Sequence, residues 1–234
     1  MSLSSHLQTC FTVSGGMRGA RAMAPVSLFV IPFGMSFGAA ALSQGLDPHD
    51  VILMSVIVFA GAAQFAALDL WGPDLPLLAI ALTVLAVNAR HLVLGAALSP
   101  WLLQVSPSRR FLTLGLLTDV NFAQAMAAKD TGETDAGFLL GGGLMLWAAW
   151  VCGTALGVLV GSGIDDVATY GLDVLMVAYF APIAVQFWEG RANLLPWAAA
   201  AGIAATGSLL LPAGWPIIAG ALAGGLVGAL RDAD

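Results

Sequence analysis

Three polar residues interrupt a long apolar run and are the first candidates for chemistry: Asn88, Arg90 and His91. Arg90 lies near the middle of the run, which covers residues 75–103. A guanidinium at that depth costs about 3 kcal/mol on insertion scales, so it needs a partner. Arg90 could bind a substrate carboxylate, while His91 could titrate or donate hydrogen bonds. The alternative is a structural ion pair that holds two helices together.

Asp119 is the natural partner for Arg90, because it lies in the middle of another apolar segment, residues 110–128. An unpaired carboxylate in the membrane would take up a proton, whereas one paired with Arg90 would stay charged. A titrating acid can couple proton movement to transport, and a paired acid can gate it. We therefore assign coupling or gating to Arg90, Asp119 and the nearby Asn121, with a static bridge as the alternative.

The first apolar segment carries Pro32, Gly34 and Ser36. Proline lacks a backbone N–H, so a helix broken here could offer free backbone groups and the Ser36 hydroxyl to an amino acid. The alternative is that Gly34 and Gly38 form a small-residue packing motif, and the two interpretations are compatible. Gln64, in the second segment, could line the same site or link two helices.

The composition indicates what must position these side chains. Of 234 residues, 59% are hydrophobic and 9% are charged, with a mean hydropathy of +0.90. Because soluble domains carry about 25% charged residues, a soluble fold is excluded. The apolar residues form runs long enough to cross a bilayer as helices, without the alternation of a barrel. The predicted segments are residues 19–43, 51–70, 75–103, 110–128, 137–161, 168–188, 193–211 and 215–230.

We therefore predict an all-α integral membrane protein with about eight transmembrane helices. The third segment would make a helix of about 43 Å against about 30 Å of hydrocarbon, so we expect a kink or break at Asn88–His91. A second kink or break is expected at Pro32. Residues 1–18 are interpreted as a cytoplasmic lead-in, and residues 19–230 as a single transmembrane domain.

A faint internal repeat suggests that this domain is duplicated, with repeats at residues 19–128 and 137–230. Leu53-Met54 and Gln64-Phe65 recur 122 residues later as Leu175-Met176 and Gln186-Phe187. Transporters are often built from such halves, with the substrate site between them.

Basic residues predict the orientation, since they concentrate in cytoplasmic loops. A cytoplasmic N-terminus puts five of them inside and leaves Arg109 and Arg110 outside. A re-entrant third segment would instead bring these two arginines inside. The five inside residues are Arg18, Arg21, Lys129, Arg191 and Arg231.

The chain resembles the AzlC family over residues 32–98, with Thr118-Asp119 continuing the resemblance. The similar pieces are Pro32-Phe33-Gly34-Met35-Ser36-Phe37-Gly38, Phe59-Ala60-Gly61-Ala62-Ala63-Gln64-Phe65 and Asn88-Ala89-Arg90-His91-Leu92. The resemblance implies an inner-membrane permease that exports branched-chain amino acids together with a small AzlD-type membrane subunit. The family usually has an acidic residue after the aspartate of the fourth segment, where this chain has Val120.

Other functions fit the sequence less well. An intramembrane aspartyl hydrolase would need Asp119 and Asp173 at one depth, but their segments place them at different depths. A non-transporting scaffold or assembly subunit does not explain charges in the middle of the membrane. We expect no metal and no cofactor, because histidines are far apart and no nucleotide motif occurs. The sequence has no basic patch, so we expect no nucleic-acid partner.

Overall fold

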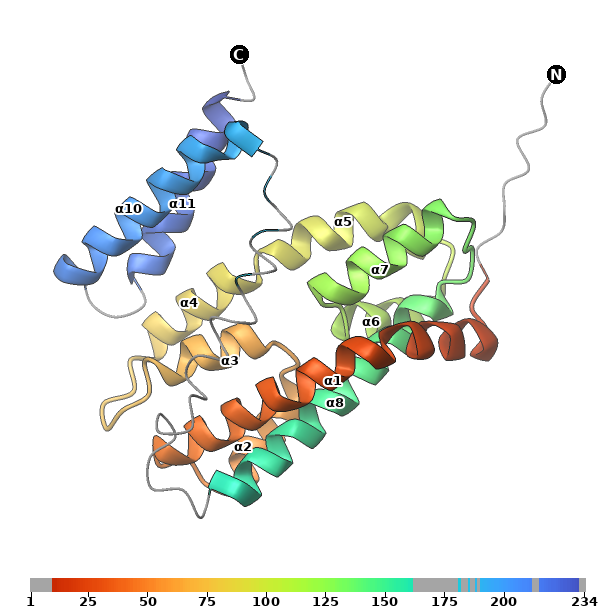
Figure 1. Ribbon diagram of the computed structural model, residues 1–234, viewed down its shortest axis with the longest axis horizontal. Helices are drawn as coiled ribbons and strands as arrows, with labels where there is room; N and C mark the ends of the chain where they lie inside the picture. Colours follow the sequence, from red (N-terminus) through yellow and green to blue (C-terminus); the bar gives the residue numbers. More distant parts are fainter. Residues whose placement is uncertain are drawn as a thin grey trace. The chain divides into compact units, whose positions relative to one another are not determined.

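The computed structural model describes residues 10–161, 190–211 and 215–231, together with residues 181, 185 and 188. The described residues form helices and no strand, which confirms the all-α membrane class (Figure 1). The elements are α1 (Val13–Ser43), α2 (Pro48–Ile57), α3 (Gly61–Leu68), α4 (Leu77–Asn88), α5 (Arg90–Leu102), α6 (Pro107–Gly115), α7 (Asp119–Asp130), α8 (Gly137–Gly161), the 3-10 helix η2 (Gly190–Asn193), α10 (Leu194–Leu210) and α11 (Trp215–Arg231).

Four stretches of the described chain are long and apolar enough to cross a membrane: Val13–Ser43, Leu77–Leu102, Gly137–Gly161 and Gly190–Leu210. They correspond to the first, third, fifth and seventh predicted segments. The second and fourth segments are each divided into two short helices, and the eighth is α11. The sixth segment, residues 168–188, lies almost wholly outside the described residues, as do the repeat partners Leu175-Met176 and Gln186-Phe187.

The first helix differs from its prediction in two ways. It begins at Val13, six residues before the predicted start of the first apolar segment. It also continues as one helix through Pro25 and Pro32, so a break at Pro32 is wrong. Transmembrane helices tolerate an internal proline where neighbouring helices and hydroxyl side chains satisfy the freed backbone groups.

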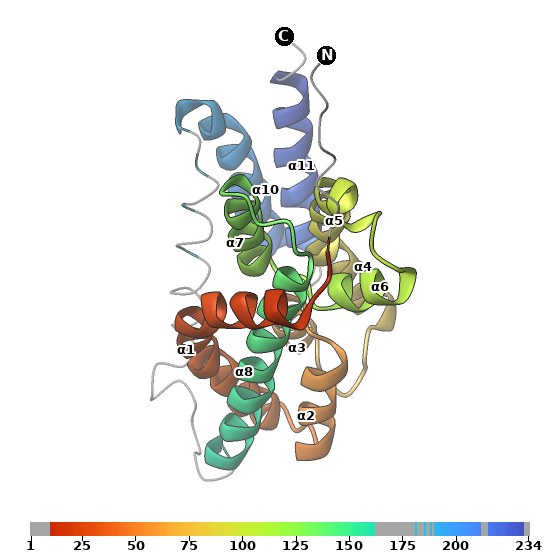
Figure 2. The same ribbon diagram turned by 90° about the vertical axis from the view of Figure 1, so that its right-hand side faces the viewer.

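Helices α1 and α8 lie side by side, as both views show (Figures 1 and 2). Glycines on each helix let the other backbone approach: a Cβ on Gly34 would lie 2.7 Å from the Trp150 carbonyl oxygen, and one on Gly157 would meet the Met35 carbonyl. The Trp150 ring also packs edge-on to Phe33, with centroids 5.2 Å apart. The packing interpretation of the Gly34 motif is therefore confirmed.

The contacts divide the chain into two compact units that alternate along the sequence. Of the described residues, the first unit holds 10–42, 46–60 and 89–161, and the second holds 43–45, 61–88 and the residues after 180. Within the second unit, α10 packs on α11, where a Cβ on Gly220 would lie 2.7 Å from the Ala200 carbonyl oxygen. The glycine-rich face of α11 is thus used, at Gly220, inside the chain itself.

Candidate functional site

The polar candidates gather where helices of the first unit are interrupted. The third segment divides into α4 and α5 at Ala89, within the stretch where a kink or break was expected, and Ala89 itself keeps α-helical backbone angles. The fourth segment also stops, at Gly115, and restarts at Asp119. Interrupted helices leave backbone groups that need partners other than lipid, so such sites are stable only inside protein or beside a polar cavity.

Helices α6 and α7 form a hairpin whose two ends lie at the same end of the first unit. Near the start of α6, the Arg109 guanidinium lies 5.1 Å from the centre of the Phe11 ring, just before α1 begins. After α7 ends, the Thr134 carbonyl accepts a hydrogen bond of 3.2 Å from Trp101 Nε1 at the end of α5. With 9 and 12 residues, α6 and α7 are about 13 and 18 Å long, roughly half a bilayer each. Both ends of the fourth segment therefore lie at the same end of the first unit.

This hairpin overturns one expectation about orientation. Arg109 and Arg110 were predicted on the face opposite to Arg18, but the contact with Phe11 puts Arg109 at the N-terminal end of α1. Arg110 lies beside it and donates hydrogen bonds to three carbonyls at the end of α5, those of Leu102, Leu103 and Val105. The cause is that the fourth segment is a hairpin of two short helices. From the sequence alone, an apolar run of 19 residues looks the same whether it forms such a hairpin or one full span.

The tip of the hairpin, residues 116–118, is held by a capping box. The Thr118 hydroxyl accepts a hydrogen bond from the Asn121 backbone N–H, and Asn121 Oδ1 accepts one of 2.7 Å from the Thr118 N–H. Asn121 Nδ2 also donates to the Leu116 carbonyl at 3.0 Å, which satisfies a group that the interruption frees. Asn121 is buried and positions the tip, so its side chain is committed to the backbone.

At this tip the two interruptions meet. Arg90 Nη1 lies 2.6 Å from Asp119 Oδ2, and His91 Nε2 donates to the Leu117 carbonyl oxygen at 3.1 Å. The Asp119 side chain is 15% exposed and the Arg90 side chain is 39% exposed. Asp119 is the first residue of α7, where the helix dipole favours a negative charge. The Nε of Arg90 is buried and has no hydrogen-bond partner among the described residues.

The remaining candidates lie elsewhere in the fold. Pro32 and Gly34 are inside α1, and the buried Ser36 hydroxyl donates to the Phe33 carbonyl at 2.8 Å within the same helix. Gln64 is fully buried in α3, and Asn88 is the last residue of α4. Both residues belong to the second unit. Arg90, His91, Asp119 and Asn121 are the candidates that the structure brings together. Asp173, which the hydrolase alternative needs, lies outside the described residues. No group of metal ligands occurs among the residues that were placed.

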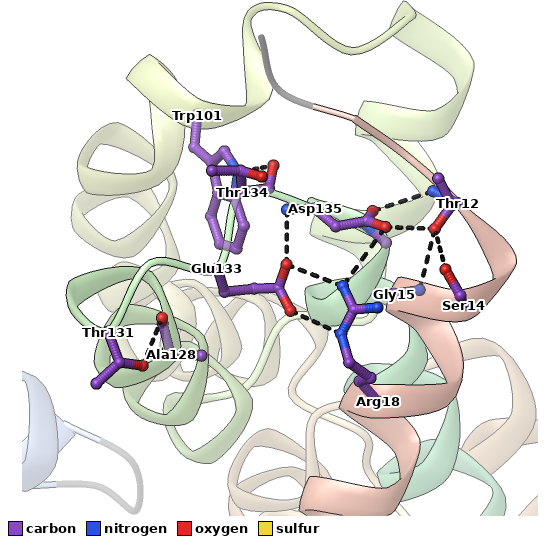
Figure 3. Close-up of polar contacts among 11 residues, drawn as sticks. Thr12, Ser14, Gly15, Arg18, Trp101, Ala128, Thr131, Glu133, Thr134 and Asp135 are labelled. Carbon is purple, nitrogen blue, oxygen red and sulfur yellow. Dashed lines mark hydrogen bonds and ion pairs between the residues drawn. The ribbon is translucent and has the colours of Figure 1, made fainter. Parts of the chain in front are cut away.

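A second polar cluster, which the sequence analysis did not predict, joins α1 to the α7–α8 loop (Figure 3). Arg18 forms two hydrogen bonds to the Glu133 carboxylate, at 2.9 and 3.0 Å, and lies 3.8 Å from Asp135. The hydrogen bonds from Arg18 lower the pKa of Glu133. Burial raises the pKa of Asp135, but hydrogen bonds from Thr12 and Gly137 outweigh it, so that the net shift is downward. The cluster fixes the ends of α1 and α8 together.

Comparison with known proteins finds one matching family profile and several similar membrane proteins. The profile of the AzlC family, described as AzlC protein, matches residues 25–164. The chain is 28% identical to the inner membrane protein YgaZ of Escherichia coli strain K12, over 92% of this chain and 90% of that protein. It is 33% identical to a membrane protein of Archaeoglobus fulgidus, over 87% of this chain and 89% of the relative. It is 31% identical to the branched-chain amino acid transport protein AzlC of Bacillus subtilis, over 70% and 64%. No solved structure matches significantly.

Proposed function

Because this chain belongs to the AzlC family of membrane proteins, we propose that it is a secondary transporter, not an enzyme. Its substrates would be branched-chain or other apolar amino acids, exported across the bacterial inner membrane. The name of the Bacillus subtilis relative supports branched-chain amino acids as the substrate class. The observation that carries the proposal is the Arg90–Asp119 ion pair, placed where two interrupted helices meet.

The proposed mechanism is an exchange of carboxylates on Arg90. An amino acid carries one carboxylate and one ammonium. Its carboxylate can replace that of Asp119 on the Arg90 guanidinium, and its ammonium can then pair with Asp119. The buried Arg90 Nε has no hydrogen-bond partner in the described chain, so a donor is ready for an incoming carboxylate. The N-terminus of α7, at Asp119, adds a positive dipole at the same place.

We also propose that transport is ion-coupled, with the Arg90–Asp119 pair acting as the coupling or gating element. Once Arg90 holds the substrate carboxylate, Asp119 would pair with the substrate ammonium, so both charges of the pair keep a partner. The ion pair and a zwitterionic amino acid together carry no net charge, so the loaded site stays neutral when both of its charges are paired with the substrate. His91 stays hydrogen-bonded to the hairpin tip and would hold Arg90 near Asp119 during this step.

The proposed orientation puts the N-terminal end of α1 in the cytoplasm. Apart from Arg90, the basic residues of the first unit lie toward this end, and the exposed acids Asp47 and Asp50 lie beyond the other end of α1. Positive residues concentrate on the cytoplasmic side of membrane proteins. These basic residues are Arg18, Arg21, Arg109, Arg110 and Lys129. The family resemblance further supports a small AzlD-type subunit as partner.

The test is export of preloaded radiolabelled valine from cells that produce this chain, with and without its small partner. Arg90→Gln should reduce initial export to background because the carboxylate loses its main donor. The matched control is Arg21→Gln, which removes an exposed cation from α1 and should leave export within a factor of two. Full export by Arg90→Gln at equal membrane abundance would contradict the proposed site. Absence of export by the unchanged chain with its partner would contradict the substrate class.

A further inference from the structure

A groove between α1 and α8 is a second candidate binding site, and it is separate from the ion-pair site. It is open, encloses about 590 Å³, and its walls are almost entirely apolar. That volume is in the usual range for small-molecule sites. Its lining includes Met17 and Ala20 from α1 with Leu144 and Ala148 from α8. At the end of the groove where both helices begin, the Arg18 cluster holds α1 to the loop before α8 (Figure 3).

The only charged side chain in its lining is Arg109, at the end where α1 begins. Arg18, nearby in α1, is paired with Glu133. Arg109 instead stacks over the Phe11 ring, is exposed, and has no carboxylate partner among the described residues. The groove therefore combines a long apolar wall with one unbalanced positive charge at its end.

The dimensions of the groove fit one leaflet of a bilayer. Its lining on α8 runs from Gly137 to Ala148, which is about 17 Å of helix. One leaflet of hydrocarbon is about 15 Å thick. An acyl chain that follows α8 from its first residue would thus reach about the bilayer midplane, while its headgroup would lie beside Arg109.

From these observations we propose that the α1–α8 groove binds an anionic phospholipid, with an acyl chain along the groove and the phosphate on Arg109. Arginine donates two parallel hydrogen bonds to a phosphate, and basic pockets between transmembrane helices bind anionic headgroups. This orientation of the lipid needs only that α1 begins at a membrane surface. The proposal is independent of which substrate the chain transports.

The experiment measures lipids retained by the purified chain in native mass spectrometry, with phosphatidylglycerol or phosphatidylcholine of identical acyl chains added. The unchanged chain should retain phosphatidylglycerol about fivefold better, the preference expected from one arginine near the headgroup. Arg109→Gln should bring the two lipids to equal retention, whereas Arg21→Gln should keep the preference. Ala148→Phe, an exposed position on the groove wall, should reduce retention of both lipids.

An unchanged lipid preference in Arg109→Gln, or unchanged retention in Ala148→Phe, would overturn the proposal. A second measurement separates a lipid from a partner helix as occupant. A photo-crosslinking residue in place of Leu144, activated in native membranes, should yield a lipid adduct identified by its mass. A protein adduct at that position instead would show that the groove is a subunit interface. Circular dichroism and gel-filtration profiles equal to those of the unchanged chain establish that each variant is folded.

Discussion

Breaking the Arg90–Asp119 pair from each side should have unequal effects on stability. At 2.6 Å the pair attracts by about 6 kcal/mol at an effective dielectric constant of 20, but solvent at the 39%-exposed Arg90 side chain screens much of this. We expect Asp119→Asn to cost about 2 kcal/mol, because it leaves a guanidinium in the membrane without a partner. Arg90→Gln should cost about 1 kcal/mol, since the α7 dipole still stabilises Asp119.

The assay is thermal unfolding of the purified variants in one detergent. For a chain of this size 1 kcal/mol corresponds to about 2–4 °C, so Asp119→Asn should lower the Tm by about 4–8 °C and Arg90→Gln by about 2–4 °C. The double variant has no unpaired charge, so its loss of stability should resemble the loss of about 1 kcal/mol in Arg90→Gln. The two single losses sum to about 3 kcal/mol, so the coupling energy between the two residues is about 2 kcal/mol. If the two single effects simply add in the double variant, the two charges are independent and the exchange mechanism has no basis.

Three further predictions test the surrounding structure. The pKa of Glu133 is lowered in the folded state, so its contribution to stability is present above its ordinary pKa of about 4.3 and is lost as the pH falls below that value. The Tm of Glu133→Gln should therefore fall less than the Tm of the unchanged chain when the pH is lowered through this range. Gly157→Ala should unfold at lower temperature because its Cβ meets backbone of α1, whereas Gly202→Ala, with open space, should gain up to about 1 kcal/mol. In a cysteine-free background, Ser108→Cys should react with impermeant thiol reagents only from the cytoplasmic side and His49→Cys only from outside; labelling of both from one side contradicts the topology.

The overall class and the charged pair were predictable from the sequence because both follow from the cost of polarity in lipid. Long apolar runs must become helices, and an arginine in the middle of one run needs the single acid in the middle of another. Neither argument depends on how the helices are connected. The pairing of Arg90 with Asp119 was therefore expected, and the structure confirms it at 2.6 Å.

The division of the fourth segment was harder to predict, because a full span and two half-length helices can have the same composition. A signal was present in the sequence: Thr118 and Asn121 are spaced as a capping box, which marks the start of a new helix. By contrast, the contact of Arg18 with Glu133 joins residues 115 positions apart. No local pattern identifies such a pair before the helices are packed.

The interruption at the hairpin tip also bears on how substrate could be recognised. The carbonyls of Leu116 and Leu117 already accept hydrogen bonds from Asn121 and His91, so the break exists without a ligand. Substrate would not have to unwind a helix in order to reach Arg90, and its binding energy would not be consumed by that rearrangement. It would need only to replace one carboxylate by another on the same guanidinium. A site of this kind favours exchange of similar charges and leaves selectivity among apolar side chains to the walls around it.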